Sequence, residues 1–468
     1  MGVEIAGQIE KVNGKELSYS EFVERYMEKN QPVVLTGLMD DWRACRDWVT
    51  ENGQPNLQFF ATHFGKSTVQ VADCGTREFT DQKRVEMFVS EFVDQWLGYS
   101  MPEGSNSSTH IVGGKPLLYL KDWHFVKEYP EYIAYTTPPL FCDDWLNMYL
   151  DNYRMHKDPD IYSGNNEIIC SDYRFVYMGQ KDLGLLFMLM FSGPIVGQQI
   201  NMKICVYNIF DDVEETKFPG FKKVIWLECI QEPNEVIFVP SGWYHQVHNL
   251  EDTISINHNW FNGYNLSWVW DLLLRDYNEA KEYIEDVKDI CDDFEGLCQR
   301  NLAANTGMNF YDFFVFLAHI SFANLVQLCN LFKETENRIW SSSPMAQHLT
   351  LNLVTIQKIA LKMKSKEELT GNFRFHLDFR QTLDDPEFSK LCSVLGTTYG
   401  MIHKQEKFEC ETNKVSMDAM RDLNIIGTFS SQHCTNPEDL VKFIEHAITY
   451  LRGICNEDNF WQSKLNGA

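Results

Sequence analysis

Short runs of residues with high β-propensity, separated by turns, fill the first part of the chain. They read PVVLTGL at 32–38, STVQVADCG at 67–75, PLLYLKDW at 116–123, YRFVYMG at 173–179, EVIFVPSG at 235–242 and TISINHNW at 253–260. Runs of Val, Ile, Tyr and Phe bounded by Gly, Pro and Asp are typical of the strands of an antiparallel sandwich or barrel. Between two of them, PEGSNSSTHIVGGKP at 102–116 predicts a loop.

Beyond residue 266 the apolar residues recur every three or four positions, which predicts amphipathic helices. One predicted helix carries Ile284, Val287, Cys291, Phe294 and Leu297 or Cys298. NLVQLCNLF at 324–332 and LVKFIEHAITYLRGI at 440–454 predict two more. We therefore expect a mainly β protein with α structure: a β domain over residues 1–265 and an α-helical domain over residues 266–468 that braces it or forms a dimer interface.

Charge and cysteine content limit the classes of partner and compartment. The 468 residues carry a formal net charge of -25, which argues against general nucleic-acid affinity and fits neutral or basic partners. The 13 cysteines include no CxxC pair, and the first residues lack an apolar core of signal-peptide length. We therefore expect reduced thiols and a cytoplasmic location. The apolar run GLLFMLMFSG at 184–193 is shorter than the roughly 20 residues that span a bilayer.

Two histidines follow a Pro-Ser-Gly turn in the segment 234–260, NEVIFVPSGWYHQVHNLEDTISINHNW. His245 and His248 are an odd number of residues apart, so on one strand they point to opposite faces and cannot easily share one metal ion. His245 is the candidate for the barrel interior, and His248 is expected to point outward or to lie in a loop. A single strand histidine is, by itself, more often structural.

The whole segment resembles the closing strands of the jumonji-C oxygenases. The resemblance extends to QPVVLTGLMDDW at 31–42, LLYLKDWHF at 117–125 and YRFVYMG at 173–179, and covers roughly residues 20–265. It implies a cupin double-stranded β-helix that holds Fe(II) and uses 2-oxoglutarate, with His245 as the distal iron ligand. The branch that it resembles implies a lysyl hydroxylase whose protein substrate is the translation termination factor. That branch has a nuclear relative that also demethylates arginine.

Further residues take roles from this resemblance, each beside a structural alternative. The Tyr119 hydroxyl either reaches the co-substrate or bonds the backbone as a barrel-lining tyrosine. Asn257 either contacts the co-substrate or is a structural amide, while His258 points to the other face. Lys121 and Asp122 are expected to form an ion pair at the rim of the barrel, of little value to stability.

The resemblance fails where the first two iron ligands are expected. After residues 173–179 the family has a pattern like Trp-Thr-Pro-Leu-His-x-Asp, whereas this chain continues QKDLGLLFMLMFSGPIVGQQINMK. No histidine lies between His156 and His245, so no His-x-Asp pair exists there. Lys203 is the nearest lysine, but its neighbours do not fit the carboxylate anchor of 2-oxoglutarate, which stays unassigned. The predicted oxygenase domain is therefore disrupted at about 180–212.

Two explanations of the apolar run remain open. It is a buried strand or helix, or it is the product of a slipped reading frame. When codons compatible with LGLLFMLMFSGPIVGQQI are read two bases on, they can spell WTPLHADVFRSYSWSAN. The histidine codon then spans the codons of residues 187 and 188, and the aspartate codon spans those of residues 189 and 190. We favour out-of-frame translation from an altered transcript or a faulty gene model, and expect severely impaired iron binding. A non-catalytic interaction protein and an inactive splice product are the alternatives to an active enzyme.

Overall fold

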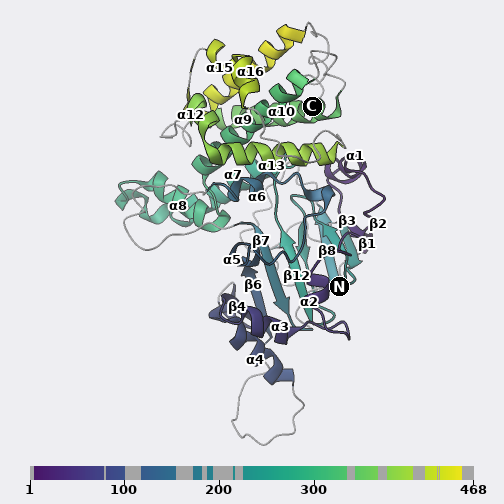
Figure 1. The fold of residues 1–468 in the computed structure, drawn as a ribbon. Helices are drawn as coiled ribbons and strands as arrows, with labels where there is room; N and C mark the ends of the chain where they lie inside the picture. The colour runs from purple at the N-terminus through teal and green to yellow at the C-terminus, as the bar shows by residue number, and fades with distance from the viewer. Residues whose placement is uncertain are drawn as a thin grey trace, which may run out of the picture. The chain divides into compact units, whose positions relative to one another are not determined.

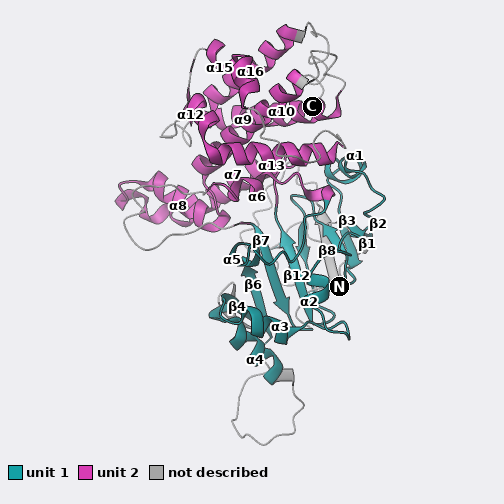
Figure 2. Ribbon diagram, viewed as in Figure 1, with its two compact units in different colours: residues 1–138, 173–259 teal, residues 139–172, 260–468 magenta. Residues whose placement is uncertain are grey.

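The computed structural model describes residues 5–78, 81–100, 117–153, 172–181, 187–192, 214, 216, 225–334, 343–366, 377–403, 417–429, 431 and 433–455. The predicted loop at 102–116, Lys203 and most of the disrupted stretch 180–212 lie outside these residues. Two compact units make up the chain (Figures 1 and 2): unit 1 comprises residues 1–138 and 173–259, and unit 2 comprises 139–172 and 260–468.

A five-stranded antiparallel sheet forms one layer of unit 1. Its order is β12-β7-β6-β4-β5, with β12 at Thr253–His258, β7 at Arg174–Gly179, β6 at Leu118–Trp123, β4 at Thr68–Glu78 and β5 at Asp81–Phe88. Four of these strands lie in segments for which the sequence predicted strands. The exception is β5, whose charged sequence DQKRVEMF shows little apolar alternation.

Two smaller sheets complete the strands of unit 1. The first has the order β1-β9-β8-β11, with β1 at Ile5–Gln8, β9 at Ile225–Ile230, β8 at Phe187–Ser192 and β11 at Tyr244–Gln246. The second has the order β10-β3-β2, with β10 at Val236–Phe238, β3 at Val33–Thr36 and β2 at Lys11–Asn13. Strand β8 lies within the apolar run 184–193.

The helices of unit 1 are short. They are α1 at Tyr19–Phe22, continued by a π-helical turn at Val23–Met27, then α2 at Ala44–Asp47, α3 at Leu57–Phe64, α4 at Val89–Ser100 and α5 at Phe125–Glu128. Helix α3 begins where the Asn56 side chain accepts a hydrogen bond from the Phe59 amide, which satisfies one of its unpaired amide groups.

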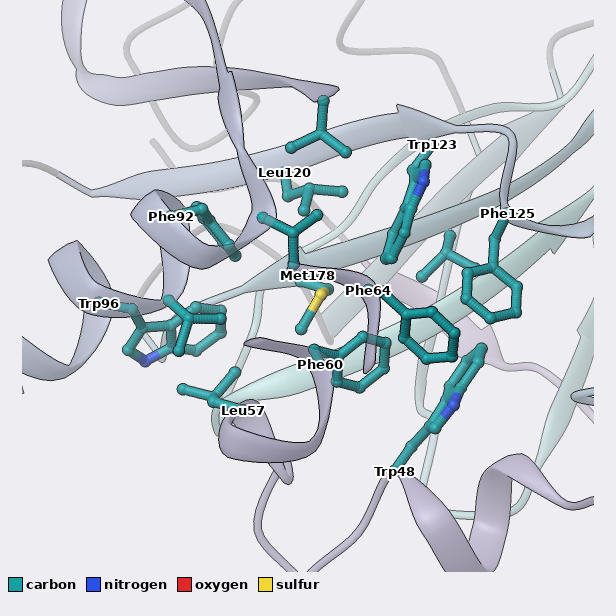
Figure 3. Close-up of a cluster of buried hydrophobic side chains, with 14 of the residues drawn as sticks. Trp48, Leu57, Phe60, Phe64, Phe92, Trp96, Leu120, Trp123, Phe125 and Met178 are labelled. Atoms are coloured by element: carbon teal, nitrogen blue, oxygen red, sulfur yellow. The ribbon is translucent and has the colours of Figure 1, made fainter. Parts of the chain in front are cut away.

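One face of the five-stranded sheet packs against α3 and α4. Leu120 and Met178 point from β6 and β7 into a cluster that includes Phe60, Phe64 and Trp96 (Figure 3). All five side chains are buried. Because side chains alternate along a strand, the burial of this face leaves the other face of the same strands to carry polar residues.

Unit 2 is helical, as the sequence predicted beyond residue 266. Its elements are a 3-10 turn at Pro139–Phe141, α6 at Trp145–Leu150, α7 at Leu266–Tyr283, a 3-10 segment at Glu285–Ile290, α8 at Phe294–Thr306, α9 at Phe310–Glu334, α10 at Pro344–Lys364, α12 at Phe379–Asp384, α13 at Pro386–Ile402, α14 at Asp418–Asp422, α15 at Ile425–Thr428, α16 at Pro437–Cys455, and a two-stranded ribbon of β13 at Leu377–Asp378 and β14 at His433–Cys434.

Helix α9 is the core of this unit and packs against α10, α13 and α16. Its residues Phe310–Lys333 are long and apolar enough to cross a membrane, with a mean hydropathy of 1.6. The 18-residue apolar window of this helix is, however, 89% buried within the protein. The helix therefore has the burial expected of the core helix of a folded unit.

The continuous amphipathic helix predicted over 284–298 is wrong. Helix α7 ends at Tyr283, and α8 begins only at Phe294. Asp293 starts α8 by accepting a hydrogen bond from the Gly296 amide, and Ile290 is 83% exposed. An apolar period alone cannot detect such an interruption, because the cap competes locally with the helix.

Residues 139–153 also differ from the predicted division at 265/266. They belong to unit 2, although they precede β7 in the chain. Every residue of α6 is buried, so this helix has no solvent face and needs apolar partners on all sides. The Trp145 indole donates to Asp143 at 2.9 Å and to Tyr399 of α13 at 3.2 Å. The helical unit thus includes a segment that composition assigned to the β domain.

Candidate active site

A tight turn and a buried tryptophan position His245. After β10 the chain turns at Gly242, whose φ of 80° is a conformation that glycine adopts without strain. Trp243 follows, and its indole nitrogen donates to the Asn30 carbonyl at 2.9 Å. The ring is buried with Val34 and Cys229, which anchors the start of β11. The His245 side chain was predicted to point into the barrel interior but is exposed, with Nδ1 3.4 Å from the Trp243 carbonyl oxygen.

Strand β8 lies beside β11, and the register places Met190 directly opposite His245. On the other side of β8, Met190 is opposite Leu227 and Met188 is opposite Cys229 of β9. Residues directly opposite one another share a face of the sheet, and so do residues two apart on one strand. Positions 188 and 190 therefore lie on the face that carries His245.

The polar face of the five-stranded sheet brings together two other predicted site residues. Tyr119 of β6 is the cross-strand partner of Gly179, and Asn257 of β12 is the partner of Phe175. Between them on β7, the ring of Tyr177 stacks on that of Tyr119 with a centroid distance of 5.8 Å. Asn257, opposite Phe175, lies on the same face of the sheet as Tyr177. The two candidates for co-substrate contact therefore lie on one face, on either side of β7.

A β-bulge in β6 turns Asp122 toward the same face. Leu120 pairs with Met178 and Trp123 with Val176, so two residues of β6 lie opposite Tyr177 alone. Asp122 takes a φ of 56°, which is uncommon for a residue other than glycine.

The Asp122 carboxylate accepts a hydrogen bond from the Tyr177 hydroxyl at 3.0 Å. The predicted ion pair between Lys121 and Asp122 is not among the contacts of these two described residues, because the bulge directs this carboxylate to a tyrosine.

Burial keeps both tyrosines of this face protonated. It raises the pKa of the Tyr177 hydroxyl far above its ordinary value, and the Asp122 carboxylate adds to the rise. Burial, with a smaller effect of Asp122, raises the pKa of Tyr119 in the same direction. The protonated Tyr177 hydroxyl is therefore the donor in its hydrogen bond to the Asp122 carboxylate.

Residues 19–265 match the protein family described as the Cupin-like domain. The chain belongs to this family, the cupin-like jumonji-C oxygenases. It is 54% identical to "Arginine-specific demethylase JMJ20" of Arabidopsis thaliana, over 96% of this chain and 98% of that protein. It is 34% identical to "2-oxoglutarate and iron-dependent oxygenase JMJD4" of Danio rerio and also of Gallus gallus. These matches cover 66% and 65% of this chain, and 73% and 72% of the two relatives.

Membership of the jumonji-C family confirms two predictions made from the sequence. The resemblance drawn over roughly residues 20–265 coincides with the matched range. The predicted fold class, a cupin-like β core followed by a helical region, is also confirmed. The roles of Tyr119, Asn257 and His245 stay predictions.

Residues 234–260 contain two further histidines, His248 and His258. Neither lies on the face that carries His245 or on the polar face of the five-stranded sheet. His248 is in the loop after β11, and its Nε2 lies 2.6 Å from the amide nitrogen of Gln246, which donates to it. Burial lowers the pKa of His248. His258 is the cross-strand partner of Arg174, and its ring lies 6.3 Å from that of Tyr135. As a neighbour of Asn257 on one strand, it points to the opposite face.

The described residues do not fit the iron centre of a jumonji-C oxygenase. They contain no group of three His, Cys, Asp or Glu side chains that could hold a metal ion. Beside His245, positions 188 and 190 are methionines, and a soft thioether does not replace the imidazole and carboxylate of a facial triad. No contact of the described residues joins His245 to Tyr119 or Asn257.

Tyr177 is the site residue that sequence reasoning missed. It stands in the run YRFVYMG, which predicted a strand and drew no attention to a single side chain. Period-two alternation in that run puts Tyr177 on the same face as Phe175 and Gly179, and away from the buried Val176 and Met178. That alternation could have marked the tyrosine. The bulge that brings Asp122 to it depends on pairing between strands.

Proposed function

We propose that this chain has the scaffold of an Fe(II)- and 2-oxoglutarate-dependent oxygenase acting on a basic side chain of a protein, and that as written it binds iron poorly. The observation that carries the proposal is the pairing of His245 with Met190. A strand does run beside the candidate iron ligand, but its residues on that face cannot complete the metal centre.

The register also supports a slipped reading frame as the cause. In the shifted frame, the codon that can spell histidine takes two of its three bases from the codon of Met188. The codon that can spell aspartate takes two of its three bases from the codon of Met190. Those are the positions on the face of His245. A shifted His-x-Asp could fall on either face of β8, and here it falls on the face of His245.

Two substrate classes are compatible with the scaffold. The relative with 54% identity is named an arginine-specific demethylase, which favours oxidation of methylated arginine. The resemblance noted in the sequence favours hydroxylation of a lysine of the translation termination factor. In both classes the reacting residue of the substrate has a basic side chain. The net charge of -25 on this chain is complementary to such a positive charge.

Metal titration calorimetry under anaerobic conditions tests the proposal. Wild type and His245→Ala are expected to bind Fe(II) equally weakly and to form no succinate from 2-oxoglutarate above background. Tight binding to wild type that His245→Ala abolishes would refute the impairment. The nucleotide sequence across codons 180–215 provides an independent test, because it must allow histidine and aspartate in the shifted frame.

A rival of another class is a protein-interaction module that keeps the partner surface without turnover. It predicts saturable binding of a protein partner by a chain that is inactive. We further propose a location in the cytoplasm and also the nucleus, a homodimer formed through the C-terminal helices, and no direct nucleic-acid or membrane partner.

A further inference from the structure

Strand β5 forms one edge of the five-stranded sheet of unit 1. Its eight residues, Asp81–Phe88, pair with β4 on one side, and no described strand pairs with β5 on the other. In an antiparallel sheet, alternate residues of an edge strand direct their backbone N–H and C=O groups outward, where another strand can bind them. The strand is longer than the usual length of about five to six residues. Its edge is therefore long enough to pair with a further strand.

The apolar face of the sheet is incompletely covered at β5. Val85 and Met87 lie opposite Val71 and Val69 of β4, on the face that packs against α3 and α4. Met87 packs against the hydrophobic cluster of that face, whereas Val85 is 44% exposed. Its cross-strand partner Val71 is only 1% exposed. A further strand beside β5 would cover the exposed part of the Val85 side chain.

Two opposite charges flank Val85 on the other face of the sheet. Arg84 and Glu86 lie opposite Ala72 and Gln70 of β4, and both charged side chains are exposed. A second copy of β5 can pair antiparallel with the first so that Val85 lies opposite the partner's Val85. Arg84 then lies opposite the partner's Glu86, and Glu86 lies opposite the partner's Arg84. This register gives one apolar and two opposite-charge cross-strand pairs, all of which stabilise a sheet.

Other registers of the same two strands are less favourable. A two-fold axis at Arg84 or at Glu86 would place like charges directly opposite each other. A register that pairs Lys83 with the partner's Glu86 would place Val85 opposite the partner's Arg84. Charged side chains on an edge strand also hinder pairing with unrelated strands. A second copy of β5 avoids that repulsion, because each charge meets its opposite.

We propose that two copies of this chain associate through β5, antiparallel and with Val85 at the two-fold axis, so that their five-stranded sheets join into one. This interface lies in unit 1 and is separate from the C-terminal helices. It requires neither iron nor a substrate, and can be tested on the full chain as written.

Val85→Cys tests the register directly. Opposite residues of an antiparallel pair have Cα atoms about 4.5–5.5 Å apart, within the range of about 4.4–6.8 Å for a disulfide. Oxidised glutathione should therefore give a covalent dimer on a non-reducing gel, as two thiols form one disulfide and two molecules of glutathione are released in reduced form. Lys83→Cys, at an exposed position on the same face of the strand, is the matched control. It would lie opposite the partner's Met87 and should cross-link no more than wild type.

Arg84→Glu and Glu86→Arg test the charge pairs. Each substitution alone places two pairs of like charges across the interface and should raise the dissociation constant of the dimer by about tenfold. Analytical ultracentrifugation over a range of protein concentrations measures this constant. The double variant exchanges the two charges and restores both pairs, so it should return to the wild-type value. That recovery distinguishes a lost interface from a folding defect.

Two results would overturn the proposal. One is Val85→Cys that cross-links no more than Lys83→Cys. The other is a dissociation constant that is the same for wild type, Arg84→Glu and Glu86→Arg, which is the result expected of a dimer formed only through the C-terminal helices.

Discussion

The Nδ1 atom of His348 lies 3.1 Å from the Nε2 atom of His403, and Nε2 of the same His348 ring lies 3.3 Å from a carboxylate oxygen of Asp143. All three residues belong to unit 2. Of two ring nitrogens in contact, one must donate and the other accept, so the contact holds a single proton. If both rings were protonated, two donors would face each other. Other polar groups of this region are the hydroxyl of Tyr399 and the rings of Trp145 and Tyr264.

The stability of unit 2 should fall in mild acid because of this pair. Burial, with the charge of His348, lowers the pKa of His403 to about 4, while Asp143 opposes the shift. A histidine with a depressed pKa is protonated in the unfolded chain first, so stability is lost as the pH falls from about 6.5 to about 4. The expected loss at about pH 5 is about 2 kcal/mol or less.

Urea unfolding monitored by circular dichroism at about pH 7.5 and about pH 5 measures this loss. His403→Gln keeps a hydrogen-bonding side chain but cannot gain a proton, so it should remove most of the pH dependence. His63→Gln, at an exposed histidine of α3, is the control and should keep it. An unchanged pH dependence in His403→Gln would contradict the assignment.

Tyr177→Phe should destabilise the polar face of the five-stranded sheet. It deletes the donor that holds Asp122 in its bulge, and a hydrogen bond to a charged group contributes about 1.5–3 kcal/mol when well formed. Because Asp122 is half-buried and gains water in the variant, we expect the free energy of unfolding, measured in urea, to fall by about 1–2 kcal/mol. Tyr283→Phe is the control, since it removes a hydroxyl from a side chain that is 88% exposed. It should leave the free energy of unfolding unchanged.

Phe64→Ala tests the support behind the candidate active site. Phe64 is 4% exposed, and its ring packs 4.6 Å from that of Tyr129 and 4.9 Å from that of Phe125. Deleting a buried phenyl ring leaves a cavity and costs about 3–5 kcal/mol. Phe88→Ala removes the same atoms from a side chain that is 48% exposed and should cost far less. Similar losses from the two variants would mean that the core of unit 1 is not packed as described.

The strands of unit 1 could be predicted because their apolar residues alternate. Val69 and Val71 of β4 are buried on either side of the exposed Gln70, and Val176 and Met178 of β7 are buried on either side of the half-buried Tyr177. The membership of α6 in unit 2 could not be predicted, because a helix buried on every side shows no apolar period to assign it.

The candidate site could be predicted only in part. Tyr119, Asn257 and His245 were named through the resemblance, and the facing positions on β8 could be named only once the register of β8 and β11 was known. Asp122 was placed in a surface ion pair, because the sequence carries no mark of a bulge. A bulge arises from unequal pairing between two strands and depends on both.

The double substitution Met188→His with Met190→Asp should create a metal site. Strand alternation places both new side chains on the face of His245, which then has an imidazole and a carboxylate beside it. Two added ligands should lower the dissociation constant for Fe(II) or Mn(II) by at least about 10- to 100-fold, the change that even an outer-shell partner of a metal ligand causes. Anaerobic calorimetry measures it, and adding His245→Ala should reverse it.

The matched control for this substitution puts the same residues one position back. Phe187→His with Leu189→Asp has the same composition, but a shift of one residue turns both ligands to the opposite face of β8. It should therefore bind metal no better than wild type. If the control gained as much affinity as Met188→His with Met190→Asp, the ligands would be acting without regard to His245. The pairing of His245 with position 190 would then not explain the missing iron centre.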